Sequence, residues 1–193
     1  MKNSIKNFDK KYNSEYYNEM YKIAPNYQVH YEKSIFFPLW KYTKERLDLL
    51  TNPKILEIGC GVGDCAHYLY DNGYTNYFGF DFSDYAIEIA RKKSPQKFEV
   101  LSAYKVNDIN FKYDVIIMNE VLEHLEDDIK VINMLNPCVF IASVPTKGGG
   151  GHARCFNSIE EVKERYYQIT IANYQYIKAN NKIKWIVFEA KIK

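Results

Sequence analysis

The fold is decided by residues 54–63, which read Lys-Ile-Leu-Glu-Ile-Gly-Cys-Gly-Val-Gly. The first five residues are mostly apolar and predict a short buried β-strand. Glycines then alternate at Gly59, Gly61 and Gly63, and glycine permits both a sharp turn and a close approach of the backbone to a ligand. Residues 64–70 continue with the pattern of a helix. We therefore expect a strand, a glycine turn and a helix in succession, with a ligand at the turn.

The same alternation of strand and helix recurs along the chain. Further strands are expected at residues 77–80, 98–101, 113–118 and 138–144. Helices are expected from the N-cap Ser83 to residue 91, at residues 127–135, and after Ser158, which begins a capping-box pattern. The tail offers strands at 167–171 and 185–189, which suit a closing antiparallel hairpin. This order predicts an α/β fold with a doubly wound, mostly parallel seven-stranded sheet that binds ligands at the carboxyl ends of its strands.

Length and composition indicate one domain of an ordinary globular protein. The 193 residues suit a single compact core. Lys and Arg number 26 against 24 Asp and Glu, and the net charge of +2 is too small to mark a dedicated binder of nucleic acid or of membrane surfaces. The four cysteines form no Cys-x-x-Cys pair, and no stretch approaches the roughly 18 consecutive apolar residues of a membrane span. We therefore expect a cytoplasmic protein without a membrane segment.

Residues 1–50 precede the first strand and are rich in tyrosine. We expect them to form a helical lid over the site, and residues 51–193 to form the core of the same single domain. The lid tyrosines have two interpretations. They stack on a flat ligand, or they pack the leading helices against the sheet, which we favour. The tyrosines in question are Tyr12, Tyr16, Tyr17, Tyr21, Tyr27 and Tyr31.

Two carboxylates accompany the glycine turn. Asp81 comes about 20 residues after Gly61, at the end of the second strand, where a carboxylate accepts hydrogen bonds from ribose hydroxyls. An adenosine-containing ligand is therefore indicated, but the turn also fits the Gly-x-Gly-x-x-Ala form of a dinucleotide fingerprint. Glu57 discriminates between the two, since it would repel a pyrophosphate and suits a ligand that carries an amine and a sulfonium.

Residues 55–63 resemble motif I of the class I S-adenosylmethionine-dependent methyltransferases, and the resemblance covers residues 54–144. It implies a Rossmann-like sheet and S-adenosylmethionine as the cofactor. It also implies that Glu57 and the turn surround the methionine end of this methyl donor, that Asp81 holds the ribose and that Phe82 lies beside the adenine. Where the family often has an acid near the adenine, this chain has Ser102 and Ala103, with Asp108 as a displaced candidate. The implied donor site comprises Glu57, Gly59, Cys60, Gly61, Gly63, Asp81, Phe82, Ser102, Ala103 and Asn119.

The acceptor chemistry is expected in residues 119–125, which read Asn-Glu-Val-Leu-Glu-His-Leu after the fourth strand. If this segment takes a helical turn, Glu120, Glu123 and His124 face one side and converge. One interpretation makes His124 a general base for an acceptor hydroxyl. Another makes the three side chains ligands of a divalent cation, Mg²⁺ or Mn²⁺, which orients and acidifies the acceptor. The third is an acidic first helical turn without a chemical role.

The Glu-x-x-Glu-His block resembles that of two methyltransferase groups understood to use it on a metal, the ubiquinone-pathway O-methyltransferases and the small-RNA 3′-terminal 2′-O-methyltransferases. The second group adds a later histidine, and His152 is the candidate here. His152 and Arg154 follow a glycine run at residues 148–151 and are also candidates for contact with the acceptor. The candidate catalytic residues, which are also the candidate metal ligands, are Glu120, Glu123, His124 and His152.

These features together predict a methyltransferase that acts on a small-molecule acceptor at oxygen or nitrogen, because little chain remains for recognising a large partner. The alternative within enzymes is a metal-dependent RNA ribose 2′-O-methyltransferase, prompted by the acids and histidines but disfavoured by the near-neutral charge. The alternative outside enzymes is a non-catalytic subunit that binds S-adenosylmethionine.

Overall fold

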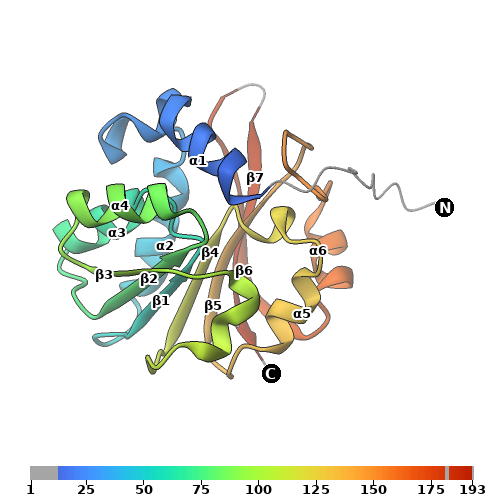
Figure 1. Cartoon of the computed structure of the whole chain (residues 1–193). Helices are drawn as coiled ribbons and strands as arrows, with labels where there is room; N and C mark the ends of the chain where they lie inside the picture. The colour runs from blue at the N-terminus through green and yellow to red at the C-terminus, as the bar shows by residue number, and fades with distance from the viewer. Residues whose placement is uncertain (1–12, 181–182, 193) are drawn as a thin grey trace.

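The computed structural model describes residues 13–180 and 183–192 and contains a seven-stranded sheet (Figure 1). The strands lie in the order β3-β2-β1-β4-β5-β7-β6, and β7 is antiparallel to both of its neighbours while all other neighbouring pairs are parallel. The order reverses between β1 and β4, which is the point where doubly wound sheets bind ligands. The strands are β1 (Ile55–Ile58), β2 (Tyr77–Asp81), β3 (Lys97–Val100), β4 (Val115–Asn119), β5 (Val139–Pro145), β6 (Ile169–Lys178) and β7 (Lys184–Ile192).

Helices cover both faces of this sheet (Figure 1). Side chains of a strand alternate between two cores, so that Ile55 of β1 belongs to the core with α2, α3 and α4, whereas Leu56 and Ile58 belong to the core with α5 and α6. The α-helices are α1 (Ser14–Ile23), α2 (Phe37–Leu47), α3 (Asp64–Asp71), α4 (Asp84–Lys93), α5 (Asp128–Asn133) and α6 (Ile159–Arg165). Short 3₁₀ turns are η1 (Pro25–Tyr27), η2 (Tyr31–Lys33), η3 (Ala103–Asp108) and η4 (Leu122–His124).

The predicted fold class is confirmed, with local differences at the ends of elements. Ser83 and Ser158 are N-caps as expected, and each accepts a hydrogen bond from a backbone amide in the first turn of its helix. The predicted strand 167–171 is instead the longer β6. Most of β6 is exposed on both faces at the edge of the sheet, so its sequence lacks the alternation of apolar and polar residues that predicts a strand. The 3₁₀ turn η3 was not expected.

The leading segment lies at the end of the sheet that carries the glycine turn, with α1 packed against α4 (Figure 1). Asn18 of α1 donates a hydrogen bond to Asp84 at the start of α4 and accepts one from Ser83. Residues 1–12 of the expected lid, including Tyr12, lie outside the described residues.

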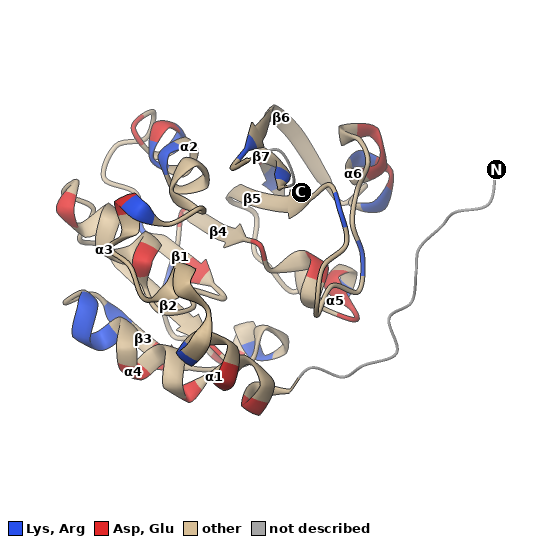
Figure 2. Ribbon diagram, turned by 90° about the horizontal axis from the view of Figure 1, so that it is seen from above, with Lys and Arg blue, Asp and Glu red and all other residues tan. Residues whose placement is uncertain are grey.

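Charged residues are spread over the helices when the ribbon is seen from above (Figure 2). The basic cluster at the end of α4, Arg91 to Lys93, occupies the last turn of the helix, where the helix dipole favours positive charge. No helix within residues 13–180 and 183–192 is long and apolar enough to span a membrane.

Candidate functional site

The three glycines of the turn between β1 and α3 all have positive φ, but their surroundings differ. A Cβ on Gly59 would lie 2.6 Å from a methyl group of Val121, and one on Gly63 would lie 2.7 Å from the Cβ of Ala90. Those two glycines are required by packing. A Cβ on Gly61 would meet only the side chain of Tyr21, with 3.2 Å to its hydroxyl. Gly61 is therefore the glycine that leaves its backbone open to the site.

Asp81 ends β2 beside this turn and is buried. Its carboxylate accepts hydrogen bonds from the amide of Gly61 at 3.0 Å and the amide of Ser83 at 2.9 Å, and from the hydroxyl of Tyr21. Burial raises the pKa of Asp81 to about 6, although these hydrogen bonds to the charged form oppose the shift. The Tyr21 hydroxyl thus occupies a position that a hydroxyl of a ligand would take on the same carboxylate.

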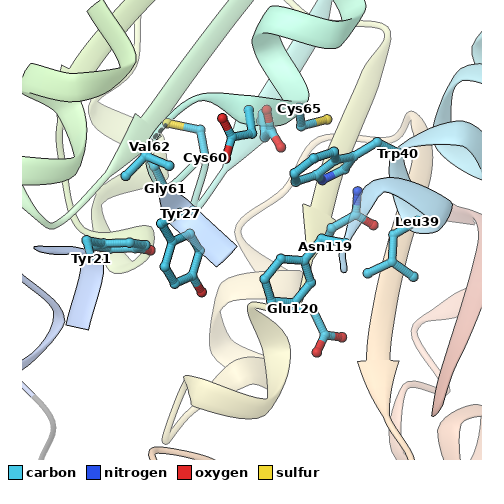
Figure 3. A pocket seen from close by; sticks show the side chains of 14 residues that line it. Tyr21, Tyr27, Leu39, Trp40, Cys60, Gly61, Val62, Cys65, Asn119 and Glu120 are labelled. Atoms are coloured by element: carbon cyan, nitrogen blue, oxygen red, sulfur yellow. Dashed lines mark hydrogen bonds between the residues drawn. The ribbon is translucent and has the colours of Figure 1, made fainter. Parts of the chain in front are cut away.

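Two adjoining cavities lie over the carboxyl ends of the strands, one of about 80 Å³ and one of about 370 Å³. The smaller one contains the first part of the turn and the aromatic residues Tyr27 and Trp40 (Figure 3). The larger one extends from Asp81 toward the loops after β4 and β5. Gly59, Tyr21 and Glu120 line both cavities, so the two together form one elongated site.

Most of the residues expected to bind the donor line these cavities. The smaller cavity is lined by Glu57, Gly59, Cys60, Gly61 and Asn119, and the larger one by Gly59, Asp81, Phe82, Ser102 and Ala103. Gly63 lines neither cavity but caps the start of α3. Asp108, weighed as an acid near the adenine, is exposed at the end of η3 and lines neither.

Glu57 is buried at the floor of the smaller cavity and accepts a hydrogen bond from the hydroxyl of Tyr77. Burial raises the pKa of Glu57 to about 7, and the hydrogen bonds from Tyr77 and from the thiol of Cys65 oppose this shift. A cation that enters the cavity would lower this pKa, so the carboxyl group would lose its proton and become negatively charged.

The expectation that Glu120 shares a helical turn with Glu123 and His124 is wrong. Glu120 has a φ of +57°, and the 3₁₀ turn η4 begins only at Leu122. The Glu120 carboxylate accepts hydrogen bonds from Ser143 at 3.0 Å and from the indole N–H of Trp185 at 2.6 Å. These partners on β5 and β7 fix the side chain without a helical turn, and its carboxyl group still lies close enough to that of Glu123 to raise the pKa of Glu123.

Glu123, His124 and His152 do converge, from the loops after β4 and β5. Their ligating atoms all lie within 4.8 Å of one another. Glu123 has no exposed surface, and neither of its carboxylate oxygens meets a hydrogen-bond donor among the described residues. Burial, and then the nearby charge of Glu120, raise the pKa of Glu123 well above its usual range. A buried carboxylate without donors is costly unless a proton or a cation accompanies it.

One ring nitrogen of His124, Nδ1, makes hydrogen bonds within the protein, and the other, Nε2, faces the cluster. Its Nδ1 lies 3.0 Å from the carbonyl oxygen of Gly151 and 2.8 Å from the hydroxyl of Tyr17. Because a carbonyl only accepts, Nδ1 carries the proton and Nε2 carries the lone pair. Nε2 lies 3.9 Å from a Glu123 oxygen. Burial lowers the pKa of His124 to about 4, so its ring is neutral near pH 7.

Arg154, expected as a contact for the acceptor, lines neither cavity. It is buried, and its guanidinium donates to the backbone carbonyls of Leu122, Leu125 and Glu126 and lies 3.1 Å from the carboxylate of Asp128. The guanidinium is thus bound to the loop that carries Glu123 and His124, and it does not contact the cavity.

A sequence profile described as "Methyltransferase domain" matches residues 31–139, which is more than half of the chain. The chain belongs to the methyltransferase domain family. Its seven-stranded sheet, described above, has the topology of an α/β Rossmann-like fold.

Among curated proteins, this chain is 30% identical over 88 residues to phosphoethanolamine N-methyltransferase 3 of Arabidopsis thaliana. The match covers 43% of this chain and 18% of that protein, so the chain spans about a fifth of the relative's length.

Solved structures share the fold at low identity. Magnesium protoporphyrin IX methyltransferase from Synechocystis PCC 6803, with bound S-adenosylmethionine, superposes with a TM-score of 0.68 at 16% identity, covering 96% of this chain and 100% of that one. The 1,6-didemethyltoxoflavin-N1-methyltransferase of Burkholderia thailandensis gives a TM-score of 0.70 at 17% identity, covering 93% and 87%.

The site also includes aromatic residues for which the sequence favoured a packing role or gave no role. Tyr17 and Tyr21 are buried as the packing interpretation expects, yet both also line the larger cavity. Their i, i+4 spacing on α1 was the available signal, because it aligns two aromatic rings on one helix face. Trp40, which lines the smaller cavity, gave no comparable signal.

Proposed function

We propose that this methyltransferase transfers the methyl group of S-adenosylmethionine to a small-molecule acceptor at oxygen or nitrogen. The observation that carries the proposal is the elongated site, in which the turn and Asp81 lie at one side and the cluster of Glu123, His124 and His152 at the other. The donor supplies an electrophilic methyl group on its sulfonium, which the acceptor attacks in line with the departing sulfur.

The donor site proposed from the two cavities fits the chemistry of that cofactor. In this assignment Glu57, with Gly59, Cys60, Gly61 and Asn119, surrounds the methionine end. Glu57 supports it because a buried carboxyl group with a raised pKa gains from a nearby cation. Asp81 accepts the ribose hydroxyls in place of the Tyr21 hydroxyl, and Phe82, Ser102 and Ala103 lie along the adenine. Gly63 begins helix α3 and makes no contact with the donor in this assignment.

Residues of the leading segment complete the proposed site as a lid. Tyr17 and Tyr21 of α1 lie over the donor cavities, and the hydrogen bond between the Tyr17 hydroxyl and Nδ1 of His124 joins α1 to the loop after β4. Such a lid excludes water from the transferring methyl group. Residues 13–50 then act as part of one methyltransferase domain with residues 51–193.

His124 is proposed to accept the proton of the acceptor at Nε2. Its proton at Nδ1 is held by Gly151, so the lone pair at Nε2 faces the cluster. Glu120 is the second candidate base, since burial raises its pKa and places it closer to neutrality than the pKa of His124. A small acceptor is proposed because the larger cavity, about 370 Å³, must also hold the ribose and adenine of the donor.

A divalent cation, Mg²⁺ or Mn²⁺, is a second proposal for the cluster. The donor set fits, because Glu123 offers carboxylate oxygens that meet no hydrogen-bond donor within the described part of the chain. His124 offers Nε2 while its other nitrogen is bonded to a carbonyl, which is the usual arrangement of a metal-binding histidine. His152 has a buried Nδ1 that also meets no partner there. Such an ion would orient an acceptor hydroxyl and lower its pKa.

The donor assignment is tested by titration calorimetry with S-adenosylmethionine, S-adenosylhomocysteine and NAD. We expect the first two to bind and NAD to give no heat, because Glu57 disfavours a pyrophosphate beside the turn. A screen that detects released S-adenosylhomocysteine, with small phenols, amines and RNA ends, then identifies the acceptor class. Binding of NAD alone would overturn the proposed function. Turnover only with RNA would favour the ribose methyltransferase, and binding without any turnover would favour the non-catalytic subunit.

The metal proposal is tested by titrating the protein with Mn²⁺ alone. Glu123→Gln removes a charged ligand and keeps the shape of the side chain, so we expect Mn²⁺ affinity to fall about 10- to 100-fold. Glu126→Gln is the matched control, since Glu126 lies three residues on, lines the larger cavity and is outside the cluster. Equal Mn²⁺ affinity in the wild type and in Glu123→Gln, together with turnover that a chelator leaves unchanged, would sink the metal proposal.

A further inference from the structure

Arg154 ties together the two loops that carry the cluster. Its side chain is only 8% exposed, and Nη1 donates to the carbonyl of Leu122 at 2.6 Å and to that of Leu125, while Nη2 donates to that of Glu126 at 3.0 Å. These carbonyls lie on both sides of Glu123 and His124 in the sequence. The guanidinium therefore fixes the backbone from which both side chains project.

The backbone next to Arg154 strengthens the same connection. The amide of Ala153 donates to the carbonyl of Glu123 at 2.6 Å. His152, one residue earlier, lies with its ring centroid 4.8 Å from that of His124, at a near-perpendicular angle. The position of His152 relative to His124 thus depends on how the segment 152–154 is fastened to the loop after β4.

We propose that Arg154 is a positioning residue for methyl transfer, which sets the contact of His124 and Glu123 with His152. The inference rests on the proposed function for its chemical meaning, because that function gives the cluster its role. Arginine suits the task, since its planar fork presents several donors at fixed angles to several carbonyls at once. Lysine keeps the charge beside Asp128 but has a single ammonium group that cannot span them.

The fold supplies a matched control in Arg165. Asp128, which has no exposed surface, accepts hydrogen bonds from Arg165 at 2.6 and 2.8 Å and from Tyr166 at 2.7 Å, and it also pairs with Arg154. The bonds that Arg165 makes in this network are to Asp128, and none runs to the carbonyls of residues 122–126. Replacing Arg165 therefore weakens the same buried ion pair without releasing the loop.

The test compares Arg154→Lys and Arg165→Lys with the wild type. The protein has only four histidines, so NMR resolves the ring signals of His124 and His152 and the nuclear Overhauser contact between them. We expect Arg154→Lys to lose that contact and to lower kcat about 10- to 100-fold, with the calorimetric affinity for S-adenosylmethionine unchanged. Turnover is measured with the acceptor that the wild type methylates best. Arg165→Lys should lower thermal stability and keep the contact and kcat.

Three results would overturn the inference. Arg154→Lys that keeps the ring contact and kcat would show that the fork is dispensable. Equal losses in Arg165→Lys, or an Arg154→Lys chain that does not fold, would assign Arg154 to general stability. If the wild type neither binds S-adenosylmethionine nor releases S-adenosylhomocysteine, the proposed function fails, and the ring contact in the variants still decides what Arg154 does.

Discussion

Replacing Asp81 with asparagine is expected to weaken the binding of S-adenosylmethionine about 100-fold. In the proposed site the ribose hydroxyls donate to this buried carboxylate, and a hydrogen bond to a charged acceptor contributes about 1.5 to 3 kcal/mol. A loss of about 2.7 kcal/mol corresponds to the factor of 100. Asparagine keeps the volume but replaces one acceptor oxygen with an amide that repels the donors it faces. Titration calorimetry with the folded variant measures the effect.

The same carboxylate makes donor affinity depend on pH. Burial raises the pKa of Asp81 to about 6 in the protein without donor, so acidification protonates the group that must accept the ribose hydroxyls. We expect protonation of Asp81 to lower the affinity about 10-fold between pH 7 and pH 5, in addition to the contribution of Glu57, whose pKa of about 7 lies in the same range. A raised pKa means that protonation of Asp81 itself favours the folded state, so this loss of affinity does not come from acid unfolding at that residue. Asp81→Asn should lose the part of this fall that comes from Asp81 and keep the part that comes from Glu57.

Asp108→Asn is the control for both experiments. Asp108 is an acid in the same half of the sheet, but it is exposed and lines neither cavity. Its replacement should leave the affinity and its pH dependence as in the wild type. An Asp81→Asn protein that is folded and binds the donor with unchanged affinity would contradict the assignment of Asp81 to the ribose.

The gathering of the glycine turn and Asp81 at one end of the sheet could be predicted because the information for it is local. The glycine turn and Asp81 follow directly from two strand ends, and the parallel pairing of β1 with β2 brings those ends together. Residues at the ends of these two strands are therefore close in space, and their positions in the sequence are enough to predict this. The elements on which this depends, β1 and β2, are fully buried strands with an apolar pattern that is easily recognised.

The acceptor half depends on partners far apart in the sequence, which no local pattern reveals. Glu120 was predicted on a helical turn, but its backbone adopts a positive φ and its carboxylate accepts a hydrogen bond from Trp185, 65 residues later. Tyr17 meets His124 across 107 residues. From the sequence, Arg154 was expected to be an available cation in a loop. Its partners are backbone carbonyls, and because every residue has one, no sequence pattern reveals which carbonyls an arginine will bind.

The turn itself allows a prediction that separates packing from backbone strain. Gly63 and Gly73 both have positive φ, at +77° and +87°. A Cβ on Gly73 would meet nothing within 4 Å, whereas one on Gly63 would lie 2.7 Å from the Cβ and 2.9 Å from the Cα of Ala90 on α4. Gly73→Ala should therefore cost about 1 kcal/mol of unfolding free energy from the backbone alone. Gly63→Ala should cost about 4 kcal/mol, because it adds a clash with backbone that cannot rotate away.

Chemical denaturation of the two variants measures this difference, and a double variant identifies its source. Ala90→Gly removes the nearest atom to the new Cβ, so Gly63→Ala with Ala90→Gly should be more stable than the sum of the two single changes by about 1 kcal/mol or more. Equal costs at Gly63 and Gly73 would mean that α3 and α4 can separate without penalty. The positive φ would then be the only reason for a glycine at position 63. A large cost that the double variant recovers would instead show that the close approach of α3 to α4 dictates the last glycine of the motif.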